Sequence, residues 1–251
     1  MEISIWILIF LPLIAFLYSS VGHGGASSYI TLFTLLGYAN SVIKPTALII
    51  NILISLVAFL MYWKTVHFPW KLFFWLVVFS IPMAYLGGQF EINPVLYRRI
   101  LGVLLLFPIA RFLNILPNSS HKIIQKNHLI LVFLGISIGF VSGIIGIGGG
   151  IILSPVLLIL GWTTLKETSA VSALFIFVNS ISGFISLFQK AETSKLFQIQ
   201  SEQSQNLMYC ILLSVMGGLL GSYLGARKFE NKVLKNILTF VLLIASIKLI
   251  Y

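Results

Sequence analysis

The sequence predicts an all-α polytopic membrane protein. Of its 251 residues, 59% are hydrophobic and 9% are charged, and the mean hydropathy of +1.04 lies far above that of soluble domains. Several charge-free apolar runs are long enough for a membrane-spanning helix, which excludes the alternating pattern of a membrane β-barrel. We expect about eight long transmembrane helices in two homologous repeats, each of which opens with a glycine-broken segment.

The first repeat is assigned to residues 1–116. Its apolar runs are each close to the length of about 20 residues that a helix needs to cross the bilayer, apart from one short piece after the first glycine segment. In order, these runs cover residues 3–21, 29–36, 46–63, 72–88 and 100–116. The polar stretch 117–128 follows them and is the clearest linker in the chain.

The second repeat is assigned to residues 129–251, and its first run, 129–161, contains no charged residue. A straight helix of that length would measure roughly 50 Å, against about 30 Å of hydrocarbon. Three consecutive glycines each cost about 1 kcal/mol in a helix, and Pro155 removes a backbone donor. The chain must therefore break or turn back near residues 146–150. Later spans are expected over 169–188, 207–226 and 234–250.

The two halves share spaced residues, which indicates an internal duplication. Gly-His-Gly-Gly at 22–25 precedes Gly-Ile-Gly-Gly at 146–149 by 124 positions, and Gly-Tyr at 37–38 precedes Gly-Trp at 161–162 by the same offset. Such repeats are common in secondary transporters, where the binding site lies at the interface between repeats.

Two topologies remain open for the glycine-broken segments. If each segment crosses the membrane once, the sixteen Lys and Arg divide equally between the two sides and give no orientation. If each forms a helical hairpin, ten lie on one face and six on the other, which restores a positive-inside bias. The hairpin also makes the repeats inverted, with both termini outside. Cysteines at Lys44 and Lys122 that react from the same side would contradict it.

The charge pattern and the reactive residues exclude several functions. The net charge of +10 is dispersed over the connecting loops, so anionic lipid headgroups account for it better than nucleic acid. Cys210 is the single cysteine, and no metal-ligand spacing, phosphate-binding loop or catalytic grouping is present. We expect no enzyme activity, catalytic residue, metal or cofactor. Whether the chain forms a homo-oligomer is left open.

The glycine segments are the candidate binding site. A helix that begins or stops at a glycine inside the membrane presents free backbone N–H groups and a partial dipole charge. Two helix N-termini that face each other would bind an anion without a basic side chain. The alternative is that these glycines only permit close helix packing. The candidate residues are Gly22, His23, Gly24, Gly25, Ala26, Gly146, Gly148, Gly149 and Gly150.

Polar side chains in apolar spans extend this site. His23 could bind an oxyanion or carry a coupled proton, or it could be a neutral imidazole bonded to a carbonyl. Asn51 and Asn179 each need a partner, because an unpaired buried amide costs several kcal/mol. Together with Ser172 and Ser180 they could converge on an anion, and interhelical bonding is the alternative.

Together, these residues resemble the sulfite exporter TauE/SafE family, also called the 4-toluene sulfonate uptake permeases. The resemblance rests on five stretches: Gly-His-Gly-Gly-Ala-Ser at 22–27, Pro-Thr-Ala-Leu-Ile-Ile-Asn at 45–51, Gly-Ile-Ile-Gly-Ile-Gly-Gly-Gly at 143–150, Leu-Ser-Pro at 153–155, and Ser-Ala-Leu-Phe through Val-Asn-Ser at 172–180. It implies a multi-pass carrier of the bacterial cytoplasmic membrane for sulfite, sulfonate or sulfoacetate. His23 and Ala26 depart from the commoner glycine-rich form, so substrate identity is not transferred.

The sequence therefore favours a secondary transporter for a small sulfur-containing anion, with its site at the two glycine-broken segments. A passive anion channel and a non-transporting membrane partner protein are the alternatives. Saturable flux would separate a carrier from a channel. Loss of transport in Gly148→Leu and Asn179→Leu would separate a carrier from a partner protein.

Overall fold

The computed structural model describes residues 5–35, 40–90, 102–103, 106, 109–110, 113, 127–189 and 201–250. In these residues the regular elements are helices: α1 (Ile5–Ser19), α2 (Ala26–Leu35), α3 (Asn40–Trp63), α4 (Trp70–Gln89), α6 (His128–Ile145), α7 (Gly150–Ile159), α8 (Leu165–Phe188), α9 (Ser201–Arg227) and α10 (Asn231–Ile250). Most of the predicted span 100–116 and of the predicted linker 117–128 lies outside the described residues. The division into two repeats stays a prediction.

The described helices make a polytopic membrane protein. Five of them, α3, α4, α6, α8 and α9, are long and apolar enough to cross a bilayer. Large apolar side chains face outward, and Phe74, Val78, Leu129 and Phe133 are between 57% and 76% exposed. A surface of this kind is covered by lipid, as expected of transmembrane helices. Among the described helices α2 and α7 have only ten residues each, and the number of about eight long helices stays a prediction.

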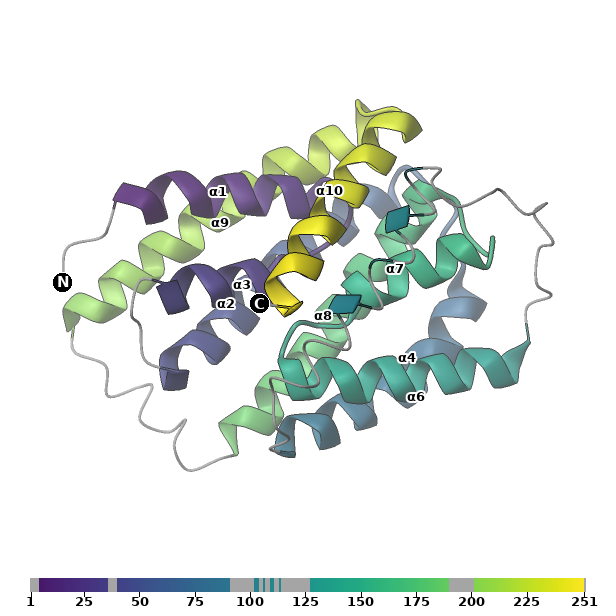
Figure 1. The fold of residues 1–251 in the computed structure, drawn as a ribbon, viewed down its shortest axis with the longest axis horizontal. Coiled ribbons are helices and arrows are strands. Elements are labelled where there is room, and N and C mark those ends of the chain that lie inside the picture. The colour runs from purple at the N-terminus through teal and green to yellow at the C-terminus, as the bar shows by residue number, and fades with distance from the viewer. Residues whose placement is uncertain are drawn as a thin grey trace.

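Helices from distant parts of the sequence pack together (Figure 1). α1 lies along α9, α6 lies along α4, and α3 packs against α8 between these two pairs. The short helices α2 and α7 contact α3 and α8, respectively. The first helix of each half thus packs on a helix of the other half, which places both glycine segments near the centre of the molecule.

Glycine ladders bring the outer helix pairs into close contact. A Cβ added at three glycines of α6, four residues apart, would meet backbone carbonyls of α4, and three glycines of α9 lie in the same way against α1. The ladder residues are Gly135, Gly139 and Gly143 of α6, and Gly217, Gly221 and Gly225 of α9. Small residues spaced by four allow backbones to approach in membranes. Close packing is therefore the role of these glycines.

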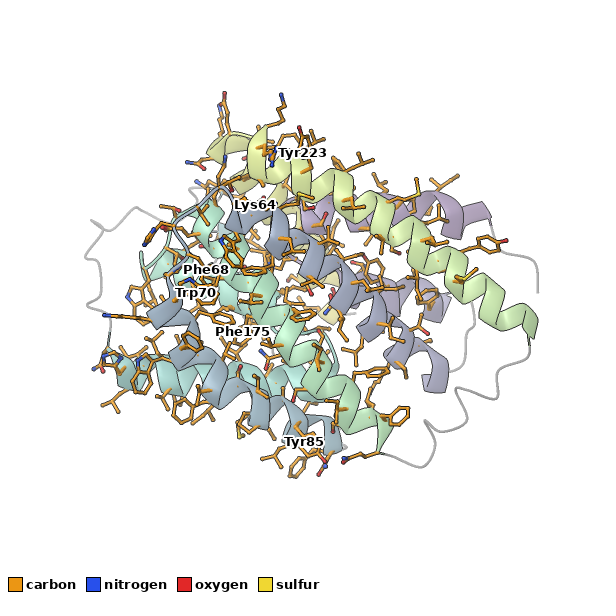
Figure 2. The ribbon with its side chains drawn as sticks, turned by 180° about the vertical axis from the view of Figure 1, so that it is seen from behind. Lys64, Phe68, Trp70, Tyr85, Phe175 and Tyr223 are labelled. Atoms are coloured by element: carbon orange, nitrogen blue, oxygen red, sulfur yellow. The ribbon has the colours of Figure 1, made fainter. Side chains whose placement is uncertain are left out.

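The chain turns back at both glycine segments. In Figure 1, α2 runs from the break toward the end at which α1 begins, and α7 returns toward the end at which α6 begins. Trp162, just after α7, shares a buried cluster with Tyr62 and Phe68 at the α3–α4 turn. Figure 2 shows Lys64, Phe68 and Trp70 near the turn between α3 and α4, and Tyr85 toward the far end of α4. Each broken segment is a hairpin in this structure.

Candidate functional site

The first break joins α1 to α2 through residues 20–25. The His23 N–H donates to the Tyr18 carbonyl at 2.9 Å, which closes the last turn of α1. Gly22 and Gly25 have φ angles of 76° and 89°, a left-handed conformation that glycine adopts without steric cost. The chain therefore reverses within six residues, and α2 begins at Ala26.

The second break joins α6 to α7 through residues 146–149. The Gly146 N–H donates to the Ser142 carbonyl at 2.8 Å and ends α6. Gly148 and Gly149 have φ angles of 75° and 77°. Within the described part of the chain, the backbone N–H groups of residues 147–151 have no hydrogen-bond acceptor, although all five residues are buried. Such a row of free donors at a helix N-terminus is suited to binding an anion.

Asn51 of α3 lies between the two breaks. Its Nδ2 donates to Ser180 Oγ at 2.8 Å, and its Oδ1 accepts from the Ala26 N–H at 3.3 Å. A Cβ on Gly24 would lie 1.8 Å from Asn51 Oδ1, and a Cβ on Gly148 would lie 2.8 Å from Asn51 Nδ2. The absence of a side chain at both glycines is therefore what lets this fully buried amide touch both breaks.

His23 connects the first break to α7. Its Nδ1 lies 3.0 Å from the Val21 carbonyl oxygen, and its Nε2 lies 3.1 Å from the Gly150 carbonyl oxygen. Ser154 Oγ is 3.2 Å from Nε2 and 2.7 Å from Ser172 Oγ. The ring nitrogens lie beside carbonyl oxygens, which agrees with the interpretation of His23 as an imidazole bonded to a carbonyl. It also joins the tips of the two hairpins.

The remaining predicted residues surround this centre. Gly22 lies against the Ser169 backbone, Gly25 against Tyr29, and Gly149 against Phe175 and Ser142, whereas a Cβ on Gly146 would have no atom within 4 Å. Asn179 Nδ2 donates to the Phe175 carbonyl on its own helix. The structure brings together His23, Gly24, Ala26, Asn51, Gly148, Gly150, Ser172 and Ser180. It does not link Gly146 or Asn179 to them by a hydrogen bond.

The sequence reasoning missed two serines of the site. Ser154 lies one helical turn after Gly150, so the spacing of four residues could have placed it on the same face. Ser142 precedes the break and packs against Gly149. It stands 124 positions after Tyr18, and the offset of the two glycine segments could have paired these residues.

The hydrogen-bond donors of the site come mainly from the backbone. None of the residues that form the hydrogen bonds described around the breaks is Lys, Arg, Asp or Glu. Both ring nitrogens of His23 face carbonyl oxygens, and a neutral ring donates to only one of them. The N-termini of α2 and α7 meet the C-termini of α1 and α6 at the breaks, so the partial charges of the helix dipoles oppose each other. An anion here would therefore be held by backbone N–H groups and not by a basic side chain.

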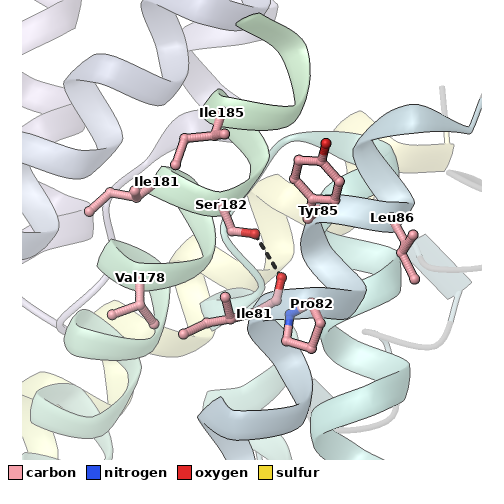
Figure 3. A pocket seen from close by; sticks show the side chains of 8 residues that line it. All are labelled: Ile81, Pro82, Tyr85, Leu86, Val178, Ile181, Ser182 and Ile185. Atoms are coloured by element: carbon pink, nitrogen blue, oxygen red, sulfur yellow. Dashed lines mark hydrogen bonds between the residues drawn. The ribbon is translucent and has the colours of Figure 1, made fainter. Parts of the chain in front are cut away.

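A separate pocket of about 650 Å³ lies between α4 and α8 (Figure 3). It is lined by Ile81, Pro82, Tyr85, Leu86, Val178, Ile181, Ser182 and Ile185. The Ser182 hydroxyl is not available as a donor to a ligand, because it donates to the Ile81 carbonyl at 2.7 Å. The Tyr85 hydroxyl donates to Gln189 Oε1. This apolar pocket has no free donors for an anion, so the glycine breaks are the better candidate.

The fold and this centre define a class: a polytopic helical membrane protein whose two broken helices meet inside the bundle, as in secondary transporters. The chain belongs to the sulfite exporter TauE/SafE family, whose family model matches residues 7–249. This finding confirms the family resemblance seen in the sequence, and it makes the chain a member of a family of membrane transporters.

Relatives named as probable membrane transporters are found in bacteria and archaea. The chain is 29% identical to the probable membrane transporter protein y4hK of Sinorhizobium fredii, over 95% of this chain and 94% of the relative. It is 28% identical to the probable membrane transporter protein MJ0441 of Methanocaldococcus jannaschii, over 56% of this chain and 54% of the relative. No solved structure matches the chain.

Proposed function

We propose that the protein is a secondary transporter that moves small sulfur-containing anions, such as sulfite, sulfonates or sulfoacetate, across the bacterial cytoplasmic membrane. The observation that carries the proposal is the row of buried backbone N–H groups at residues 147–151 that have no acceptor among the described residues. Leaving a buried donor unpaired costs about 1–3 kcal/mol. An oxyanion at the start of α7 would accept from several of them at once.

The absence of a basic side chain suits a carrier. Charge-assisted hydrogen bonds from backbone donors hold an oxyanion with defined geometry. A buried Lys or Arg would add a full charge that must be neutralised when the anion leaves. Backbone dipoles leave no such uncompensated ion, so the unloaded site is stable enough for a transport cycle.

The arrangement of the helices supports two inverted homologous repeats. α1 packs on α9 as α6 packs on α4, and both pairs are joined by glycine ladders. The hairpins enter from opposite ends of the molecule (Figure 1), and Asn51 of α3 contacts both, at the Ala26 N–H and beside Gly148. Inverted repeats around a central site are the geometry that allows alternate opening to the two sides.

The basic residues support an orientation. The loops after α3, α7 and α9 and the helix ends beside them carry six basic residues: Lys64, Lys71, Lys166, Arg227, Lys228 and Lys232. By the positive-inside rule the end of the bundle that carries them is cytoplasmic, so both termini are outside. Anionic lipid headgroups are the partners that this end would contact.

Flux of radiolabelled sulfite and methanesulfonate into proteoliposomes tests the proposal. We expect saturable uptake with counterflow, and its loss in Gly148→Leu. Ser214→Ala is the matched control, because its hydroxyl bonds within α9 at 2.7 Å to the Cys210 carbonyl. Non-saturating flux without counterflow would identify a channel instead. No flux of either anion with folded protein would contradict transport of this substrate class.

A further inference from the structure

Two buried polar atoms beside the second break have no hydrogen-bond partner among the described residues. They are Asn179 Oδ1 and Ser142 Oγ, and their residues are only 1% and 2% exposed. Ser142 Cβ would lie 3.2 Å from a Cβ on Gly149, so this hydroxyl is next to the free N–H groups. Buried polar atoms are nearly always paired, and exceptions mark sites where a ligand or water completes the bonding.

The free atom of Asn179 is an acceptor. Nδ2 donates to the Phe175 carbonyl at 2.9 Å. The reverse orientation of the amide would place two oxygens at that distance, which is unfavourable. Oδ1 can only accept hydrogen bonds. Whatever completes its bonding must therefore bring a donor.

Asn179 faces the second break from α8. Phe175, Ile176 and Ser180 all lie within 3.0 Å of a Cβ built on Gly148 or Gly149. Asn179 lies four and three residues after the first two, and hence on the same helix face. A Cβ on Gly183, one turn further, would have no atom within 4 Å. The space next to Gly183, one turn from the amide, is therefore open.

The charge of the site sets a second condition. Among the described residues, none of the side chains that form hydrogen bonds around the breaks belongs to Lys or Arg, so no basic side chain there balances a bound anion. The backbone donors supply only partial charges. A dianion brings a larger desolvation cost than a monoanion into such a buried site, so the site favours a monoanion.

We propose that the second break selects a singly charged oxyanion that carries its own hydrogen-bond donor. The oxyanion accepts from the N–H groups of residues 147–151, and the donor points at Asn179 Oδ1. The proposal rests on the proposed function, and it narrows the substrate class from sulfur-containing anions in general to monoanions with an N–H or O–H group.

Three anions of similar tetrahedral shape test both conditions. Sulfamate is a monoanion with an N–H donor, methanesulfonate is a monoanion with a methyl group in its place, and sulfate is a dianion. Their affinities would be measured by isothermal titration calorimetry on the full chain in lipid nanodiscs. We expect sulfamate to bind about tenfold more tightly than methanesulfonate, and sulfate to bind most weakly.

Variants assign the preference to the amide. Asn179→Leu keeps the side-chain size but removes the acceptor, so the tenfold ratio between the affinities of sulfamate and methanesulfonate should fall to about one. Ser182→Ala is the control on α8, because its hydroxyl bonds to the Ile81 carbonyl of α4. It should keep the tenfold ratio.

The outcomes separate this proposal from the proposed function. Equal binding of sulfamate and methanesulfonate by the unaltered protein, or a ratio that survives in Asn179→Leu, overturns the donor requirement and leaves anion transport standing. Sulfate binding as tight as that of sulfamate overturns the charge requirement. No binding of any of the three anions overturns the anion site itself.

Discussion

Alanine at Gly148 and at Gly146 forms a matched pair that tests the second break. Both glycines have φ angles near 75°, at 75° and 78°. An L-residue in that conformation costs about 1–2 kcal/mol. The two sites differ in their surroundings. A Cβ on Gly146 would meet no atom within 4 Å, whereas one on Gly148 would lie 2.7 Å from Ser180 Oγ and 2.8 Å from Asn51 Nδ2.

The free-energy cost of placing a side chain at Gly148 therefore has two further contributions. Overpacking typically adds about 1–3 kcal/mol, and separation of Asn51 from Ser180 loses a hydrogen bond worth about 1 kcal/mol. We expect a loss of stability of roughly 1–2 kcal/mol for Gly146→Ala and roughly 3–6 kcal/mol for Gly148→Ala. Flux should persist in the first variant and be lost in the second.

Thermal unfolding in detergent would rank the two variants, and proteoliposome flux would be measured at a temperature where both are folded. Equal losses of stability would show that the contacts of Gly148 are unimportant. Normal flux in folded Gly148→Ala would refute the argument that the break must lie directly against Asn51.

Other predictions concern single groups. Asn51→Asp keeps the acceptor for the N-terminus of α2 but replaces the donor to Ser180 of α8 with a negative charge. Flux should therefore fall at least tenfold, while size-exclusion chromatography should show that the protein is still folded. Tyr62→Phe removes the hydroxyl that donates to a carbonyl of the first break, and it should lower the unfolding temperature by the equivalent of about 1 kcal/mol. Cysteines at Lys64 and Thr163, in a Cys210→Ser background, should react with a membrane-impermeant reagent from the same side. Reaction from opposite sides would show that α6 and α7 cross the membrane as one segment.

The fold class and the two breaks could be predicted because composition and backbone rules determine them. Charge-free apolar runs indicate membrane helices, and three glycines followed by Pro155 interrupt a run that is too long for the bilayer. The path of the chain after each break could not be decided in the same way. A glycine-broken apolar run allows both a single crossing and a hairpin, and the packing of α2 on α3 and of α7 on α8 decides between them.

The burial of polar side chains was predictable, and their hydrogen-bond partners were not. An unpaired amide in an apolar span costs several kcal/mol, so Asn51 and Asn179 could be selected from the sequence as residues that need a hydrogen-bond partner. Their partners depend on the rotation of α3 and α8 about their axes, which tertiary packing decides. The two amides consequently have different roles: Asn51 reaches Ser180 across the interface, whereas Asn179 bonds within its own helix.

The two breaks are not equivalent, and this asymmetry bears on how the site opens. At the first break, the N–H groups of His23 and Ala26 are already paired, whereas those of residues 147–151 are free among the described residues. Side-chain contacts between the two halves near the breaks run from Asn51 of α3 to Ser180 of α8, and from His23 Nε2 to the Gly150 carbonyl and Ser154 Oγ. Nε2 either donates or accepts, so it makes one full hydrogen bond at a time. Two hydrogen bonds at about 0.5–1.5 kcal/mol each sum to roughly 1–3 kcal/mol, which is of the size at which a minor open state is populated without ligand. Hydrogen bonds to charged groups in their place would contribute about 1.5–3 kcal/mol each, so the weaker bonds between the two halves keep this centre closed and still able to open.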